Sequence, residues 1–280
     1  MAYNGTNQYL VVWGDNRNAN VDIFGQLVNT TGTLSGGNFV ISDAANNQMT
    51  PSIAYNGTNQ YLVVWHDNRS GTNWDIYGQL VNTSGLLDPG GNFPISNDVS
   101  NQLEPSVVYN SSTNQYLVVW QDVRNSNDDI YGQLVDVGGL LSGGNFPIST
   151  DPDDQRVPSI AYNSSTNQYL VVWHDYRSGI NRDIYGQYLT DTGALTAGNF
   201  VIVDAPNYLD SPHVVGNTIV GNYLVAYSDN DVPRDYSWVI VGQRQQAAIP
   251  TVSQWGMIIF MVLAGLGAVY YMRRQRSVKN

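Results

Sequence analysis

Aspartate and arginine recur together at a fixed position in this chain of 280 residues. Each pair follows a Tyr-Leu-Val-Val-Trp run, and a second aspartate follows a few residues later. The pairs are Asp15/Arg17, Asp67/Arg69, Asp122/Arg124 and Asp175/Arg177, and the second aspartates are Asp22, Asp75, Asp129 and Asp183. A guanidinium next to carboxylates predicts a turn held by a forked ion pair, with Asp side chains capping backbone N–H groups.

The alternative for these aspartates is a cation in each copy. Asp67, Ser70, Asn73 and Asp75 supply the oxygen ligands that calcium prefers. The arginine within the segment competes with a cation, and the spacing lacks the alternating aspartates of known calcium loops. We therefore expect no cofactor, with calcium as the open alternative at Asp67, Asn73 and Asp75.

Paired carboxylates are also what a glycosidase places on either side of a bond. Here they recur four times in similar settings, with no neighbours that would separate their pKa values. The sequence therefore predicts no catalytic residue.

Two histidines occupy the position directly after the strand tryptophan. His66 and His174 stand there in the second and fourth copies, where the others have Gly14, Gln121 and Ser228. Histidine is a common metal ligand, but two without a matching third make a weak site. The alternative is an exposed, tolerant position. His66 and His174 remain candidates for ligand binding.

Four segments vary while their flanks repeat, namely 18–21, 70–74, 125–128 and 178–182. Loops on a rigid scaffold often carry binding residues, although drift in loose loops gives the same pattern. Trp74 and Tyr176 offer aromatic rings for stacking on a sugar or on a protein partner. We expect these two side chains to bind ligand if the loops do.

The elements that position these residues repeat about every 53 residues. Tyr3, Tyr55, Tyr109 and Tyr162 open successive copies at spacings of 52, 54 and 53, and a degenerate fifth copy begins near Gly216. Each full copy contains four short runs rich in Val, Ile, Tyr and Trp, bounded by Asn-Gly, Ser-Gly and Pro-Gly turns. Four antiparallel strands per copy predict an all-β fold, a β-propeller.

The copies resemble the YLVVWxDxR…DIYGQ repeats of bacterial secreted propeller-like proteins over residues 1 to about 246. We expect about five four-stranded blades, at about 1–50, 51–104, 105–157, 158–210 and 211–246. The first copy lacks most of its opening strand and the fifth lacks its closing strand. The ring could close by pairing the two ends, or the blades could be an incomplete ring.

Charge is distributed unevenly along the chain. All 23 acidic residues precede Trp255, and four of the twelve basic residues follow Met272. So acidic a body repels nucleic acid, which excludes a nucleic-acid partner. The chain has no cysteine. It opens at Met1 inside a repeat without a signal peptide, so we expect the true start to lie upstream.

The C-terminal residues predict a membrane segment. No charge occurs from Trp255 to Met272, and a basic cluster of Arg273, Arg274 and Arg276 follows. We expect a linker at 247–256, a transmembrane helix at 257–272 and a basic cytoplasmic tail at 273–280, with the body outside. These residues alone are consistent with a simple anchor.

Ile249, Pro250, Thr251, Val252, Trp255 and Gly256 together resemble the motif of the IPTL-CTERM sorting domain of Gram-negative bacteria, with Val252 in place of Leu. The resemblance implies recognition by an exosortase-type enzyme, removal of the tail and delivery to the cell surface. We expect an exported, non-catalytic scaffold for binding or adhesion, with an extracellular glycan or protein as its ligand. The alternative is a propeller-type polysaccharide hydrolase or lyase with an axial active site.

Overall fold

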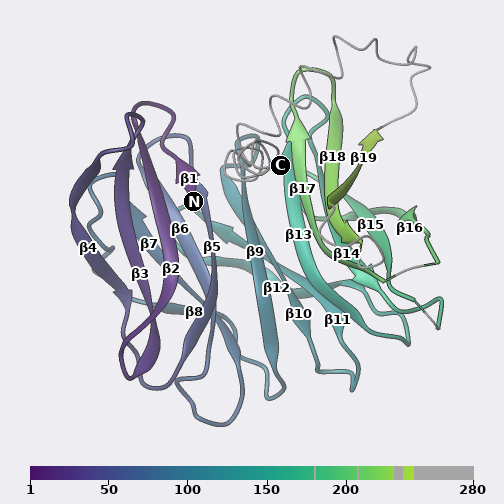
Figure 1. Ribbon diagram of the computed structural model, residues 1–280, viewed down its shortest axis with the longest axis horizontal. Coiled ribbons are helices and arrows are strands. Elements are labelled where there is room, and N and C mark those ends of the chain that lie inside the picture. Colours follow the sequence, from purple (N-terminus) through teal and green to yellow (C-terminus); the bar gives the residue numbers. More distant parts are fainter. Residues whose placement is uncertain (180, 207, 230–235, 243–280) are drawn as a thin grey trace, which may run out of the picture. The chain divides into compact units, whose positions relative to one another are not determined.

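Five antiparallel sheets follow one another along the chain, one for each repeat copy (Figure 1). The computed structural model describes residues 1–179, 181–206, 208–229 and 236–242. The first sheet contains β1 (Ala2–Tyr3), β2 (Gln8–Asn18), β3 (Asn20–Asn29) and β4 (Leu34–Ser42); the second β5 (Gln48–Tyr55), β6 (Gln60–Asp67), β7 (Asp75–Asn82) and β8 (Phe93–Ser96); the third β9 (Gln102–Asn110), β10 (Gln115–Asp122), β11 (Asp129–Asp136) and β12 (Leu141–Ser149); the fourth β13 (Gln155–Asn163), β14 (Gln168–Asp175), β15 (Asp183–Thr190) and β16 (Leu195–Val203); the fifth β17 (Leu209–Asn217), β18 (Asn222–Asp229) and β19 (Tyr236–Gly242).

Side-chain caps fix the turns between the first two strands of a sheet. The side-chain oxygen of Asn56 accepts hydrogen bonds from the backbone N–H groups of Thr58, Asn59 and Gln60, each at 3.0 Å. Gly57 takes a φ of +75° between them, which favours glycine. Asn4 makes the same three bonds in the first sheet. The repeated Asn-Gly pairs therefore set the register of the strands that follow.

The second strand of each central sheet is buried on both faces. Tyr61, Val63 and Trp65 pack toward the first sheet, whereas Leu62 and Val64 pack toward the third. All five side chains are fully buried. A strand between two sheets must be apolar on both faces, which explains the unbroken Tyr-Leu-Val-Val-Trp run.

The opening strands β5, β9, β13 and β17 lie next to one another in chain order, and each forms an edge of its own sheet. Figure 1 shows them near the centre, with the closing strands β4 and β16 at the outside. Each opening strand has a bulge, where the pairing with the second strand shifts register. Thr50, Glu104, Val157 and Ser211 stand at these bulges with φ between +48° and +54°.

The prediction of an all-β propeller with four-stranded blades is confirmed. The first sheet has only Ala2–Tyr3 as its opening strand, and the described part of the fifth sheet has three strands. Within the described ranges, no helix is long and apolar enough to cross a membrane. The predicted helix at 257–272 and the sorting residues from Ile249 to Arg276 lie outside the described residues.

Candidate functional site

In each of the first four sheets, the repeated Asp-x-Arg segment forms a hydrogen-bonded fork at the end of the second strand. In the second sheet, Trp65 Nε1 donates to Asp67 Oδ2 at 2.7 Å, and Arg69 donates through Nε and an Nη nitrogen to both carboxylate oxygens at 2.9 and 2.6 Å. The guanidinium lies 3.8 Å from the centre of the Tyr77 ring. The same contacts recur around Asp122 and Asp175. These contacts support the structural interpretation of the fork.

The calcium candidates are already engaged by protein donors. Asp67 is fully buried, and its two oxygens accept from Trp65 and Arg69. The amide nitrogen of Asn73 donates to Asp75 Oδ1 at 2.7 Å and to the carbonyl oxygen of Asp98 at 2.8 Å. Asn73 thus ties the loop to the segment before the next opening strand. In the part of the chain that the structure describes, no three His, Asp or Glu side chains converge on one point.

The position after the strand tryptophan is buried in the second, third and fourth copies, so its interpretation as an exposed, tolerant site is wrong for His66, Gln121 and His174. His66 is 5% exposed and contacts Thr50 Oγ1 at 3.0 Å and 3.2 Å through its two ring nitrogens. Its Nδ1 also accepts the backbone N–H of Glu104 from the next sheet at 3.2 Å. Burial lowers the pKa of His66 to about 4, so the ring is neutral near pH 7.

His174 occupies the same place in the fourth sheet and meets a different neighbour. It is 3% exposed, and its Nδ1 lies 2.9 Å from Asp210 Oδ1 of the fifth sheet, close in distance but not aligned as a hydrogen bond. The pKa of His174 is lowered to about 4, chiefly by burial; the charge of Asp210 opposes this shift and the nearby Arg182 adds to it. Arg182 in turn donates to Asp210 Oδ2 at 2.6 Å.

These contacts define a junction between each pair of neighbouring sheets. Every junction combines the residue after the strand tryptophan, the residue before the second aspartate, and the two bulge residues of the next opening strand. The four sets are Gly14, Val21, Met49 and Thr50; His66, Trp74, Leu103 and Glu104; Gln121, Asp128, Arg156 and Val157; and His174, Arg182, Asp210 and Ser211. The scaffold around the junctions repeats, whereas the junctions themselves all differ. Differences between copies are therefore concentrated at one place in the fold.

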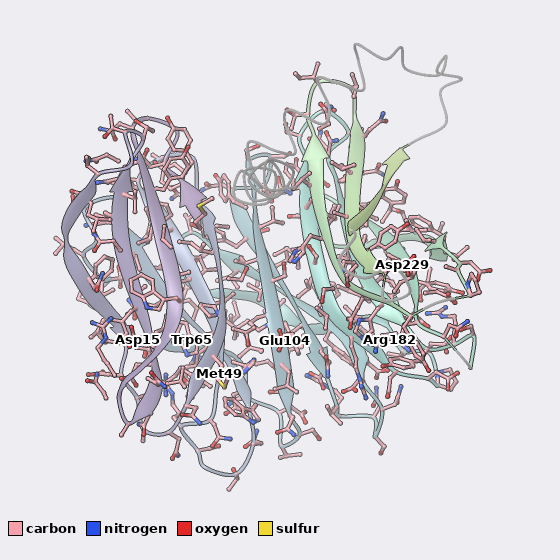
Figure 2. The ribbon with its side chains drawn as sticks, viewed as in Figure 1. Asp15, Met49, Trp65, Glu104, Arg182 and Asp229 are labelled. Atoms are coloured by element: carbon pink, nitrogen blue, oxygen red, sulfur yellow. The ribbon has the colours of Figure 1, made fainter. Side chains whose placement is uncertain are left out.

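The second junction contains Glu104, the only glutamate in the chain. Figure 2 labels it on the central strand β9, between Met49 and Arg182. The side chain is half-buried, and burial raises its pKa above the usual value. Sequence reasoning missed this residue because Glu104 lies outside the repeated Asp positions. The bulge dipeptides Met49-Thr50, Leu103-Glu104, Arg156-Val157 and Asp210-Ser211 carried the signal, since they vary before a fixed proline.

The third junction is a closed network of charges. Gln121 Nε2 donates to Asp128 Oδ1 at 2.9 Å, and Arg156 pairs with Asp128 Oδ2 and, at 2.7 Å, with Asp154 Oδ2. Asp128 is 8% exposed. A buried carboxylate held by a guanidinium and an amide is fixed in position.

The first junction is hollow instead. Gly14 contributes no side chain where His66 and His174 stand in other copies. An open hollow of about 500 Å³ is lined there by Gly14, Asp15, Asn16, Val21, Met49 and Thr50.

The two predicted aromatic binding residues lie at different junctions. Trp74 is half-buried, and its ring meets His66 edge-on at 4.7 Å between centroids. Tyr176 is half-buried between Arg156 and Arg182, whose guanidinium carbons lie 5.4 and 5.7 Å from its ring centre. The structure brings His66 together with Trp74, and His174 with Tyr176, whose rings meet edge-on at 5.8 Å between centroids. Among the described residues, no contact joins the first pair to the second.

Comparison with known proteins identifies the C-terminal segment. Residues 247–276 match the IPTL-CTERM motif, which implies export, processing by an exosortase-type enzyme and sorting to the surface. None of the curated proteins compared with this chain matches it in sequence.

The body is similar in fold to solved propeller structures. An α-L-arabinanase from Penicillium chrysogenum in complex with arabinobiose shares 14% identity, with a TM-score of 0.57 over 84% of this chain and 78% of that chain. An exo-β-1,3-galactanase from Phanerochaete chrysosporium with galactose shares 13% identity, with a TM-score of 0.51 over 79% of this chain and 53% of that chain.

These matches contradict the prediction of a non-catalytic binding or adhesion scaffold. Both solved structures are enzymes that act on polysaccharides, and they favour the hydrolase alternative over the main prediction. The same matches contradict the prediction that the chain is not an enzyme. At 13–14% identity the likeness establishes the propeller fold, and any activity depends on this chain's own residues.

Proposed function

We propose that the protein is a surface-delivered glycoside hydrolase whose active site lies at the junctions around the opening strands. The observation that carries this proposal is Glu104. It is the one glutamate of the chain, it stands on the central strand β9, and burial raises its pKa. A carboxyl group with a raised pKa keeps its proton long enough to protonate the oxygen of a leaving sugar.

A glycosidase also needs an ionised carboxylate to act as base or nucleophile. The junctions that follow Glu104 offer Asp128 and Asp210. Arg156 forms an ion pair with Asp128, and Arg182 forms an ion pair with Asp210. Both residues belong to the bulge of an opening strand: Asp210 is the first residue of its bulge dipeptide, and Glu104 is the second residue of its own. We assign Asp210 as the first candidate for the second carboxylate and Asp128 as the next.

Substrate contacts would come from the aromatic side chains of the same junctions. Trp74 offers a half-buried indole beside His66, and Tyr176 offers a ring between two guanidinium groups. Such rings stack on the apolar face of a sugar. The similar enzymes act on arabinan and β-1,3-galactan, so neutral plant polysaccharides are the first substrates to test.

The sorting signal defines where such an enzyme would work. Before processing, we propose that the body lies outside the inner membrane and the basic end at 273–280 lies inside. Removal of the tail by the exosortase-type enzyme would then release the body to the cell surface, where an acidic hydrolase meets extracellular polysaccharide.

The test is release of new reducing ends from arabinan, xylan and β-1,3-galactan by the full-length chain in detergent. Glu104→Gln should lower the rate at least about 100-fold, as expected for loss of a general acid. Asp88→Asn is the matched control, because Asp88 lies in the turn between β7 and β8 and caps the backbone of Gly90. Turnover unchanged in Glu104→Gln, or no release from any of the three polysaccharides, would contradict the proposal.

A further inference from the structure

An exposed leucine recurs where the chain enters each closing strand. The four equivalent residues, which pair at the same register with the third strand of their sheets, are Leu34, Leu87, Leu141 and Leu195. All four side chains are exposed, and Leu86 and Leu140, directly before two of them, are 66% and 71% exposed. An apolar side chain that repeats in four copies yet is exposed on its own sheet indicates a contact outside the fold.

These leucines lie in or directly after the turns between third and fourth strands, at the same end of the sheets as the turns between first and second strands. In the second sheet, the backbone N–H of Thr83 donates to the carbonyl oxygen of Asn59 at 3.1 Å. Between the third and fourth sheets, Asn110 Nδ2 donates to the carbonyl oxygen of Asp191 at 3.0 Å. We call this end of the sheets the turn end; it comprises the turns at 56–60, 83–86, 110–115, 137–140, 163–168, 191–194 and 217–222. The opposite end, which carries the junctions, is the junction end.

The fifth sheet adds apolar side chains to the turn end, and its last strand ends there. Asn163 Nδ2 donates to the carbonyl oxygen of Asn217 at 3.1 Å, which joins the first turn of the fifth sheet to that of the fourth. In this turn Ile219 is 84% exposed. Gly242, the last residue of β19, pairs with Asn222 directly after the same turn, and Figure 1 shows β17 and β19 directed toward one end. The path to the C-terminal segment therefore begins at the turn end.

Little chain separates the turn end from the predicted membrane segment. Residues 243–254 are all that lie between Gly242 and the uncharged run that begins at Trp255. Even fully extended, such a segment reaches only about 40 Å. Because this tether is attached at the turn end, it holds that end nearer to the membrane surface than the junctions, which lie about one strand length away.

The two ends of the sheets also differ in charge. Among the acidic side chains that the structure describes, only Asp88, Asp136 and Asp191 lie in or beside the turns of the turn end. The others lie toward the junction end, in the Asp-x-Arg segments, at the second aspartates, at the junctions and in the segments before the opening strands. Anionic lipid headgroups repel clustered carboxylates. A lipid surface therefore fits the turn end and not the junction end.

From these observations we infer that the turn end docks on the outer surface of the inner membrane while the C-terminal segment is still attached. Leu86, Leu140, Ile219 and the exposed leucines beside them enter the headgroup region of the bilayer, as the apolar side chains of interfacial segments do. Docking directs the junction end, and Glu104 with it, away from the bilayer. This inference rests on the membrane topology in the proposed function and is independent of the proposed hydrolysis.

Quenching by spin-labelled lipid tests the inference on the full-length chain in vesicles of phosphatidylcholine and phosphatidylglycerol. The chain has no cysteine, so Leu86→Cys, Leu140→Cys and Ile219→Cys each provide a single attachment site for an NBD fluorophore. A spin label near the headgroup end of the lipid acyl chain should lower NBD fluorescence at these three positions at least about two-fold. Val99→Cys is the matched control, because Val99 is apolar, 93% exposed and lies in the segment before β9, at the junction end. A label there should keep its fluorescence.

A second set of variants separates docking by the leucines from simple tethering. The triple change Leu86→Ser/Leu140→Ser/Leu195→Ser alters only exposed side chains. It should restore the fluorescence of a label at Ile219→Cys, because the apolar contact with the bilayer is lost. Quenching at Ile219→Cys that persists in the triple variant would show that the tether alone brings the turn end to the membrane, and would overturn the inference.

A label at Leu263→Cys, within the predicted membrane segment at 257–272, reports insertion of that segment separately. Quenching at Leu263→Cys with none at the turn end would overturn the inference and leave the membrane topology intact. No quenching at either place would contradict the topology and the inference together. Self-quenching at Leu140→Cys that rises with the protein-to-lipid ratio, without any effect of the spin label, would assign the turn end to a second copy of the chain and overturn the inference. Release of reducing ends from polysaccharide tests the hydrolase separately, and its absence would not change these results.

Discussion

The backbone N–H of Glu104 donates a hydrogen bond to Nδ1 of His66 over 3.2 Å, across the junction between the second and third sheets. Nδ1 can accept this bond only without a proton, so the neutral ring carries its proton on Nε2. Thr50 Oγ1 lies against the same ring, 3.0 Å from Nδ1 and 3.2 Å from Nε2. The ring therefore holds the bulges of two neighbouring opening strands at once.

Folding stability should fall as the pH drops from about 6.5 to about 4. Burial lowers the pKa of His66 and His174 from 6.5 to about 4 in the folded chain. Within that window the unfolded chain binds protons that the folded chain does not, so acid favours unfolding, by at most about 3 kcal/mol per histidine. Urea unfolding followed by tryptophan fluorescence at several pH values measures the slope.

The double variant His66→Gln/His174→Gln should flatten the dependence of folding stability on pH, because it removes both titrating rings. Glutamine should be tolerated there, since Gln121 already occupies the equivalent buried position in the third sheet. His213→Gln is the control, since His213 is exposed on β17. A slope that persists in the double variant would assign the acid sensitivity to other groups.

The Asp-Arg fork should contribute more to the free energy of unfolding where it is buried. Asp122 is fully buried and Arg124 is 21% exposed, so Asp122→Asn should lower the free energy of unfolding by about 2 to 3 kcal/mol. In the first sheet the side chains of Asp15 and Arg17 are 16% and 46% exposed. Asp15→Asn should therefore cost distinctly less. Equal losses in chemical unfolding would show that burial does not set the strength of the fork.

Gly186 should not tolerate a side chain. An added Cβ would lie 2.7 Å from Ile202 Cδ1 and 3.3 Å from both Leu170 Cδ1 and Phe200 Cζ. Gly186→Ala should cost about 1 to 3 kcal/mol by overpacking. A Cβ added at Gly198 of the same sheet would meet no atom within 4 Å, so Gly198→Ala should be close to neutral. Thermal unfolding of the two variants provides the comparison, and a neutral Gly186→Ala would contradict the packing argument.

Hydrolysis, if Glu104 is the general acid, should decline as the pH rises through the pKa of that carboxyl group. Because burial raises this pKa, the decline should begin above the usual range for glutamic acid. The dependence of kcat/KM on pH, measured on the most rapidly cleaved polysaccharide, gives the value for the free enzyme. A rate that stays level through this range would exclude Glu104 from the role.

The sequence by itself determined the repeat, the strands and the sorting signal at the C-terminal end. Identical Tyr-Leu-Val-Val-Trp runs, Asn-Gly turns and fixed Asp-x-Arg segments are local signals, because each residue acts on near neighbours in the chain. The IPTL-like segment is local in the same sense, and its match covers residues 247–276. The fold class followed from the number and spacing of these signals.

Tertiary structure alone decided which side chains meet across the junctions. His66 and Glu104 are 38 residues apart, and His174 and Asp210 are 36 apart. Their contacts depend on how one sheet packs against the next, which no local pattern encodes. Packing also buried three of the recurrent aspartates, Asp67, Asp122 and Asp175, and the two histidines. How deeply a side chain is buried and which groups it contacts depend on how the sheets pack against one another. These two properties distinguish the candidate acid from the repeated carboxylates.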